Sequence, residues 1–234
     1  MSIKPPIILA VDTPDLDIAR QWIETTSDFI CAYKVGLEFF TTFGPEGVKK
    51  LQDASDVDLF LDLKLHDIPN TVAGAARGVA ELAPRFLTVH ASGGHAMISA
   101  AVEQAPQVEI TAVTILTSLS ALDLQEIGFA QNPLDSAVKL ALLSQGAGAR
   151  AIVCSPHEIF AIRESVGPDL TIIAPGVRPI GEGGLDDQTR TMSPRAAILA
   201  GATYLVIGRP ITRHWVDGAE AMRNRAAAIV EGLG

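Results

Sequence analysis

The sequence of 234 residues has a formal net charge of −9, with 48% hydrophobic and 5% aromatic residues. This acidic balance argues against a general nucleic-acid-binding protein, because phosphate backbones are bound by an excess of Lys and Arg. The apolar run in the N-terminal stretch MSIKPPIILAVD is too short for a signal sequence or a membrane span. We therefore expect a soluble, cytoplasmic protein with no membrane partner.

The two cysteines of the sequence, Cys31 and Cys154, both lie in apolar, strand-like segments. We expect them to be reduced thiols in the core, as is typical of intracellular proteins. Neither a CxxC pair nor a Cys/His cluster has the spacing of zinc ligands, so we expect no metal site.

Eight short apolar runs follow one another along the chain, and most lack the polar/apolar alternation of half-exposed strands. Such continuous runs are typical of parallel strands that are covered on both faces. The runs are residues 7–12, 29–36, 58–65, 86–91, 109–116, 149–155, 170–176 and 203–208. Helices are expected at residues 15–26, 71–83, 95–105, 133–146, 156–167, 193–202 and 218–232.

The alternation of strands and helices, closing with a helix, predicts an α/β protein with the (β/α)8 TIM barrel fold. The alternative is a doubly wound open sheet, which usually has fewer strands and often a glycine-rich first turn. The first strand here runs instead into VDTPD. No linker or change of composition divides the chain, so we expect a single barrel domain over residues 1–234.

Reactive side chains gather where the expected strands end, which is where TIM barrels have their active sites. On the third strand, Asp62, Lys64 and His66 share one face, and the three leucines between and before them share the other. The leucines can then face the helices while the charges point into the mouth of the barrel. The reactive residues at strand ends are Asp12, Lys34, Asp62, Lys64, His90, Thr117, Ser118, Arg178 and Arg209.

The charges around the third strand need partners, because an isolated buried ion is very unfavourable. Lys34, Asp62, Lys64 and Asp67 sum to zero charge, so we expect them to meet in one network. Such a network could be a salt-bridge cluster that only closes the barrel. Four charges at the catalytic end favour a reaction centre.

The last two strands indicate a phosphate site. The motifs APGVRP and VIGRPIT each place a Gly and an Arg directly after a strand. Loops 7 and 8 of TIM barrels commonly bind phosphate through backbone N–H groups and a guanidinium. We therefore expect a phosphorylated ligand.

These motifs together resemble the bacterial type of the orotidine 5′-phosphate decarboxylase family. The resemblance rests on AVD ending at Asp12, YKVG around Lys34, DLKLHDIPNT, LTS, PGVRP, DDQ ending at Gln188, and IGRPIT. It runs nearly end to end, and the extended motif DLKLHDIPNT is its most specific part.

The resemblance implies conversion of orotidine 5′-monophosphate to UMP and CO₂, the last step of de novo pyrimidine synthesis, without a metal or organic cofactor. Lys64 would stabilise the carbanion that forms at C6 of the ring and would then protonate it. Asp62 would lie beside the substrate carboxylate, and Asp62 and Asp67 would keep Lys64 charged. Lys34 would belong to the same network.

Binding roles are also implied. Asp12 and Lys34 would bind ribose hydroxyls, and Thr117, with Ser118 beside it, would contact the pyrimidine ring. Residues 178–190 would form a mobile loop that closes over the phosphate. The phosphate grip would consist of Arg178, Gln188, Gly208 and Arg209.

The resemblance further implies a homodimer, in which Asp67 and Thr71 reach the site of the partner subunit. Two alternatives stay open. One is a magnesium-dependent sugar-phosphate decarboxylase or synthase of the same superfamily, although IPNT and the Thr117–Ser118 pair favour a pyrimidine nucleotide. The other is a non-catalytic pyrimidine-nucleotide-binding protein, against which the intact charges argue. We expect His66 and His90 to be structural.

Overall fold

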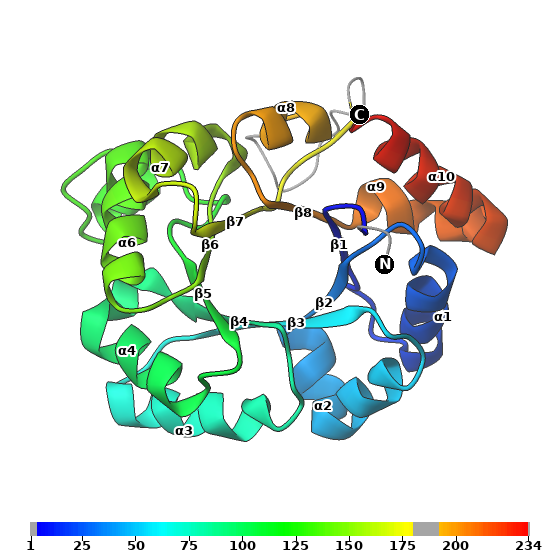
Figure 1. Cartoon of the computed structure of the whole chain (residues 1–234), viewed down its shortest axis with the longest axis horizontal. Helices are drawn as coiled ribbons and strands as arrows, with labels where there is room; N and C mark the ends of the chain where they lie inside the picture. Colours follow the sequence, from blue (N-terminus) through cyan, green and yellow to red (C-terminus); the bar gives the residue numbers. More distant parts are fainter. Residues whose placement is uncertain (1–3, 180–191, 234) are drawn as a thin grey trace.

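The computed structural model describes residues 4–179 and 192–233, and within them eight parallel strands close into a barrel in chain order (Figure 1). Pairing of β1 with β8 completes the ring. The strands are β1 Ile7–Ala10, β2 Ala32–Gly36, β3 Asp58–Leu65, β4 Phe86–His90, β5 Glu109–Val113, β6 Ala151–Val153, β7 Thr171–Ala174 and β8 Tyr204–Ile207. The TIM barrel expected from the sequence is confirmed, with several strands shorter than their apolar runs.

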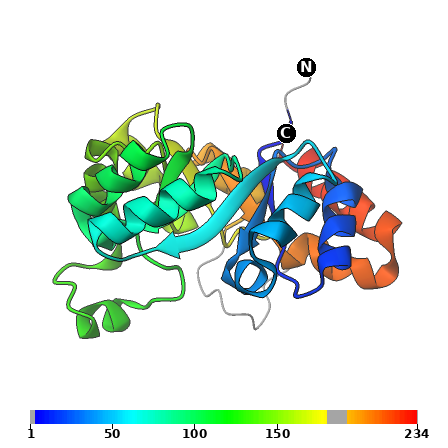
Figure 2. The same cartoon turned by 90° about the horizontal axis from the view of Figure 1, so that it is seen from below.

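Helices surround the barrel, as two views at right angles show (Figures 1 and 2). In the described part of the chain, none of them is long and apolar enough to cross a membrane. They are α1 Leu16–Thr26, α2 Leu37–Gln52, α3 Pro69–Ala80, α4 Gly94–Gln104, α5 Ala121–Glu126, α6 Pro133–Gly146, α7 Ile159–Val166, α8 Pro194–Leu199, α9 Arg209–Thr212 and α10 Ala219–Glu231. Short 3₁₀ turns are η1 Ala91–Gly93, η2 Pro156–Glu158 and η3 Arg213–Asp217.

Helix α2 was not expected from the sequence, because Gly44 and Pro45 lie in its middle and usually interrupt a helix. The chain passes this point by a kink: Gly44 has φ 60° and ψ −163°, and helical geometry resumes beyond it. Pro45 then starts the second half of the helix, where a missing N–H removes no hydrogen bond. The short helices α5 and α9 were also not expected.

The core has two layers. The larger layer lies between the strands and the helices, and the smaller one fills the interior of the barrel. On β3, Leu61 and Leu63 belong to the outer layer and Phe60 to the inner one, so the expected alternation is confirmed there. The inner layer consists of Ile8, Ala10, Cys31, Ala32, Phe60, Phe86, Ala151, Ile173 and Val206.

Arg85 closes the amino end of the barrel. Its guanidinium donates hydrogen bonds to Asp58 at 3.0 Å, Glu109 at 3.2 Å and the Tyr204 hydroxyl at 2.7 Å. It also lies 4.8 Å from the centre of the Phe86 ring, at a distance typical of a cation–π contact. These residues begin four of the strands, so the cavity of the barrel opens at the carboxyl ends.

Candidate active site

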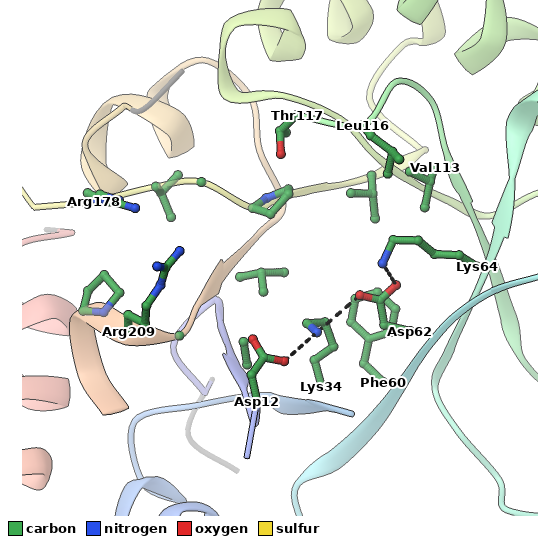
Figure 3. Close-up of a pocket in the computed structure, with 18 of the residues that line it drawn as sticks. Asp12, Lys34, Phe60, Asp62, Lys64, Val113, Leu116, Thr117, Arg178 and Arg209 are labelled. Carbon is green, nitrogen blue, oxygen red and sulfur yellow. Dashed lines mark hydrogen bonds and ion pairs between the residues drawn. The ribbon is translucent and has the colours of Figure 1, made fainter. Parts of the chain in front are cut away.

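A cavity of about 280 Å³ lies at the carboxyl ends of the strands (Figure 3). Eight of the side chains or backbone positions named from the sequence line it: Asp12, Lys34, Asp62, Lys64, Thr117, Arg178, Gly208 and Arg209. Apolar residues complete the wall, among them Phe60, Val113, Ile115, Val153 and Val206. The sequence therefore located the cavity correctly, from residues spread over six of the eight strands and the loops that follow them.

Four of these side chains form a chain of alternating charge (Figure 3). The Lys34 ammonium lies 3.4 Å from Asp12 and 3.3 Å from Asp62, and the Lys64 ammonium lies 2.8 Å from the other oxygen of Asp62. The side chains of Lys34 and Asp62 are only 12% and 13% exposed. Each buried charge thus has an opposite charge beside it, as the cost of burying ions requires.

The pKa values of the two most buried members move in the directions that keep both charged. Burial favours the neutral form of Asp62, but Lys34, Lys64 and hydrogen bonds from Lys64 and Thr88 hold the pKa of this carboxyl below its usual 3.8. Burial likewise opposes the charge of Lys34, but Asp62 and Asp12 raise its pKa above 10.5. Lys34 and Asp62 are therefore both charged at neutral pH.

An irregularity in β3 determines where Lys64 lies. Leu61 pairs with Leu87 of β4 and Leu65 with Val89, so the register shifts between them. Lys64 has φ 48°, a left-handed conformation that is uncommon for residues other than Gly. The bulge turns the Lys64 side chain toward Asp62 and the cavity. A regular alternation along the strand, as expected from the sequence, does not describe this end of β3.

In Figure 3, Arg178 and Arg209 lie on the side of the cavity opposite Lys64. They follow β7 and β8, and Gly208 lies directly before Arg209. A Cβ atom at Gly208 would be 3.1 Å from the Cβ of Ala10, a contact so tight that Ala10 would have to shift. Two guanidinium groups opposite an ammonium suit an anionic group at one end of a ligand and a reacting centre at the other.

Asp67 is not part of the network within this chain, contrary to the expectation from the sequence. It is exposed, and its carboxylate accepts a hydrogen bond from the N–H of Ile68 at 2.6 Å. Asp12 replaces it as the fourth charge. The reason is positional: Asp67 lies beyond the end of β3, in the turn that leads into α3.

Two other residues named from the sequence, Ser118 and Thr71, do not line the cavity. Ser118 is exposed next to Thr117, and Thr71 is exposed in the first turn of α3. Gln188, with most of the segment 178–190, lies outside the described residues.

The two histidines near β3 and β4 form a pair outside the cavity, with ring centres 5.3 Å apart. Burial lowers the pKa of His90, and the neighbouring His66 and Lys64 lower it further. His90 is therefore neutral at neutral pH and adds no charge to the site. Within residues 4–179 and 192–233, no group of three or more His, Cys, Asp or Glu could hold a metal ion.

A closed barrel with a partly buried cluster of alternating charges at the carboxyl ends of its strands is the arrangement of a TIM-barrel enzyme. Residues 5–224 match the model of the family described as "Orotidine 5'-phosphate decarboxylase / HUMPS family". The chain belongs to this family, which confirms the resemblance found in the motifs.

Similar proteins agree with this assignment. An orotidine 5′-phosphate decarboxylase from Thermobifida fusca is 52% identical over 216 residues, which cover 92% of each chain. One from Moorella thermoacetica is 46% identical over 239 residues, covering 98% of this chain and 94% of the other. The crystal structure of the orotidine 5′-phosphate decarboxylase from Lactobacillus acidophilus has a TM-score of 0.84 and 31% identity, over 99% and 100% of the two chains.

Proposed function

We propose that this enzyme is a carboxy-lyase that converts orotidine 5′-monophosphate to UMP and CO₂ in pyrimidine synthesis, without a metal or organic cofactor. The observation that carries the proposal is the Lys64 ammonium, fixed 2.8 Å from Asp62 and facing a cavity with two arginines at its other side. Membership of the family and relatives bearing this name over nearly their whole length support it.

The reaction poses an electrostatic problem, because loss of CO₂ leaves an electron pair on C6 of the ring with no neighbouring electron sink. The Lys64 ammonium is the group of this chain that can stabilise that charge. The bond from C6 to the carboxyl carbon breaks and CO₂ leaves. Lys64 then gives a proton to C6 and recovers one from solvent. A cation that is already fixed before reaction favours the carbanion over the carboxylate ground state.

Asp62 serves this step by holding Lys64 in place. Its carboxylate bridges the two lysines, so each ammonium has a negative charge beside it. In the bound state Asp62 lies beside the substrate carboxylate, whose repulsion is relieved as CO₂ leaves. The preorganised Lys64 cation favours the carbanion independently of that repulsion.

The remaining groups bind the nucleotide. Asp12 and Lys34 bind ribose hydroxyls from the ends of β1 and β2, and Thr117, helped by Ser118, contacts the pyrimidine ring. Arg178, Gly208 and Arg209 bind the phosphate, together with Gln188 from outside the described residues. Phosphate binding at a distance from C6 can contribute to the chemical step, because it fixes the ring against Lys64.

Three further features belong to the proposal. The protein acts as a homodimer in which Asp67 and Thr71 complete the neighbouring subunit's site, and Ile68 between them has 66% of its surface exposed. The chain is one barrel domain. It works in the cytoplasm, in keeping with Cys31 and Cys154, which are both buried and unpaired.

The test follows the loss of orotidine 5′-monophosphate absorbance after EDTA treatment. We expect turnover by the wild type, and a loss of about 10³-fold or more in Lys64→Ala, because the group that stabilises the transition state is gone. Lys50→Ala, which removes an exposed lysine on α2, is the matched control and should be fully active.

Each contrary result has a definite meaning. Activity that EDTA abolishes and Mg²⁺ restores would favour a magnesium-dependent sugar-phosphate enzyme. Tight UMP binding without turnover would favour a nucleotide-binding protein.

A further inference from the structure

Thr88, a residue of β4, contacts two parts of the charge network from behind the cavity wall. Its side chain is fully buried and does not line the cavity. Its hydroxyl accepts a hydrogen bond from the N–H of Lys64 at 2.8 Å and donates one to Oδ1 of Asp62 at 3.0 Å. Nothing in the apolar run FLTVHA distinguishes this threonine by sequence.

The register of the sheet explains why this hydroxyl is needed. Leu61 pairs with Leu87 and Leu65 with Val89, so residues 62–64 of β3 all lie opposite Thr88. Lys64, with φ 48°, donates its N–H to the Thr88 hydroxyl at 2.8 Å. The Thr88 hydroxyl therefore satisfies a backbone donor in a left-handed conformation that would otherwise be costly.

The direction of these hydrogen bonds is fixed by chemistry. A backbone N–H can only donate, so the Thr88 oxygen accepts from Lys64, and its own proton is left for Asp62. The same Oδ1 of Asp62 accepts from the Lys64 ammonium at 2.8 Å. The result is a closed ring that runs from the Lys64 backbone through Thr88 and Asp62 to the end of the Lys64 side chain.

We propose that Thr88 is a positioning residue for the decarboxylation. Its hydroxyl fixes the backbone turn at Lys64 and the orientation of Asp62, and so sets where the Lys64 ammonium meets C6 of the substrate. This inference rests on the proposed function. Because ribose and phosphate are bound by groups on other strands, loss of the hydroxyl affects the chemical step and leaves nucleotide affinity nearly unchanged.

The neighbouring strand offers a matched control. Thr111 of β5 pairs directly with Thr88 in the sheet and is also fully buried. Its hydroxyl, however, donates to the carbonyl oxygen of Glu109 at 2.9 Å, away from the charge network. A Thr→Val change at either position removes one hydroxyl at constant shape, but only at Thr88 does it remove a contact to the reaction centre.

The experiment measures the single-turnover rate constant with enzyme in excess over orotidine 5′-monophosphate. For Thr88→Val we expect a loss of about 10- to 100-fold, the range for lost hydrogen bonds to charged groups. UMP affinity should stay within about twofold of wild type. Thr88→Ser, which keeps both hydrogen bonds, should restore most of the rate, and Thr111→Val should be close to wild type.

Three results would overturn the role of Thr88: a folded Thr88→Val with the wild-type rate, a Thr88→Ser as slow as Thr88→Val, or an equal loss of UMP affinity. If Thr88→Val does not fold, Thr88→Ala removes the hydroxyl without bulk, and the same criteria apply to it. A wild type without turnover would count instead against the proposed function, so the two failures are distinguishable.

Discussion

At the scale of single residues, the site depends on Asp62, which accepts from Lys34, Lys64 and Thr88 at once. The motif around it identified Asp62 and Lys64 by sequence, because charges inside an apolar strand are unusual. Thr88 could not be found in this way, since its role depends on a bulge in the neighbouring strand. Within one chain, charge counting gave the right total, but Asp12 rather than Asp67 is the fourth charge of the network. The role of Asp67 in a partner subunit's site stays a prediction.

Asp62 should make stability depend on pH. Its pKa is below the usual 3.8 in the folded protein, so its contribution is complete above pH 3.8 and is lost as pH falls through the folded value. We expect Asp62→Asn to be less stable at pH 7 by on the order of 3 kcal/mol, because two lysines lose their partner. The difference in unfolding free energy between wild type and Asp62→Asn should become smaller below about pH 4.

Urea unfolding of wild type and Asp62→Asn between pH 7 and pH 3 tests this expectation. Asp56→Asn, at an exposed aspartate just before β3, is the control. A difference in unfolding free energy that stays constant over the whole range would contradict a pKa shift at Asp62.

At the scale of elements, the strands were predictable because parallel strands buried on both faces leave uninterrupted apolar runs. The irregular end of β3 was not, because a register shift depends on pairing with β4 and has no local signal. Helix α2 was missed for the opposite reason: Gly44 and Pro45 give a strong local signal for a break, which the structure accommodates as a kink.

The kink in α2 should depend on glycine. Gly44 has φ 60° and ψ −163°, a region that is nearly exclusive to glycine, while a Cβ there would meet no atom within 4 Å. We expect Gly44→Ala to lower the free energy of unfolding by about 1–3 kcal/mol through backbone strain alone.

Gly78→Ala is the control, for which we expect the opposite change in the free energy of unfolding. Gly78 lies inside α3 and also has open space, so alanine should stabilise the helix by about 0.5–1 kcal/mol. Thermal or urea unfolding of both variants measures the difference. Equal effects of the two substitutions would mean that the kink imposes no strain on a side chain.

At the scale of the whole molecule, one chain supplies both ends of the cavity, the charged network and the arginines. Asp67 and Thr71 stand outside it, exposed around the start of α3. The same stretch that produced the most specific motif thus has two parts, one inside the barrel and one on its surface. In the proposed homodimer, a second copy of the chain would contact the exposed part.

The shared site can be tested by mixing chains. Lys64→Ala and Asp67→Ala should each be nearly inactive alone. After exchange of equal amounts, half of the dimers are mixed, and each mixed dimer has one site with both residues intact. We therefore expect recovery of about a quarter of wild-type turnover.

Exchange itself must be shown, for example with one chain carrying an affinity tag. Mixed dimers that are isolated by the tag and remain inactive would rule out a shared site. Full activity of Asp67→Ala alone would do the same.

The cluster of Arg85 with Asp58, Glu109 and Tyr204 determines how molecules enter and leave the cavity. Because it and the aromatic rings beside it fill the amino end of the barrel, the cavity communicates with solvent at its carboxyl end. In the proposed reaction, the nucleotide and the released CO₂ then both pass through this opening. No new substrate can enter until UMP has left. The turnover rate therefore cannot exceed the rate at which UMP leaves through that opening, however fast the bond to the carboxyl group breaks.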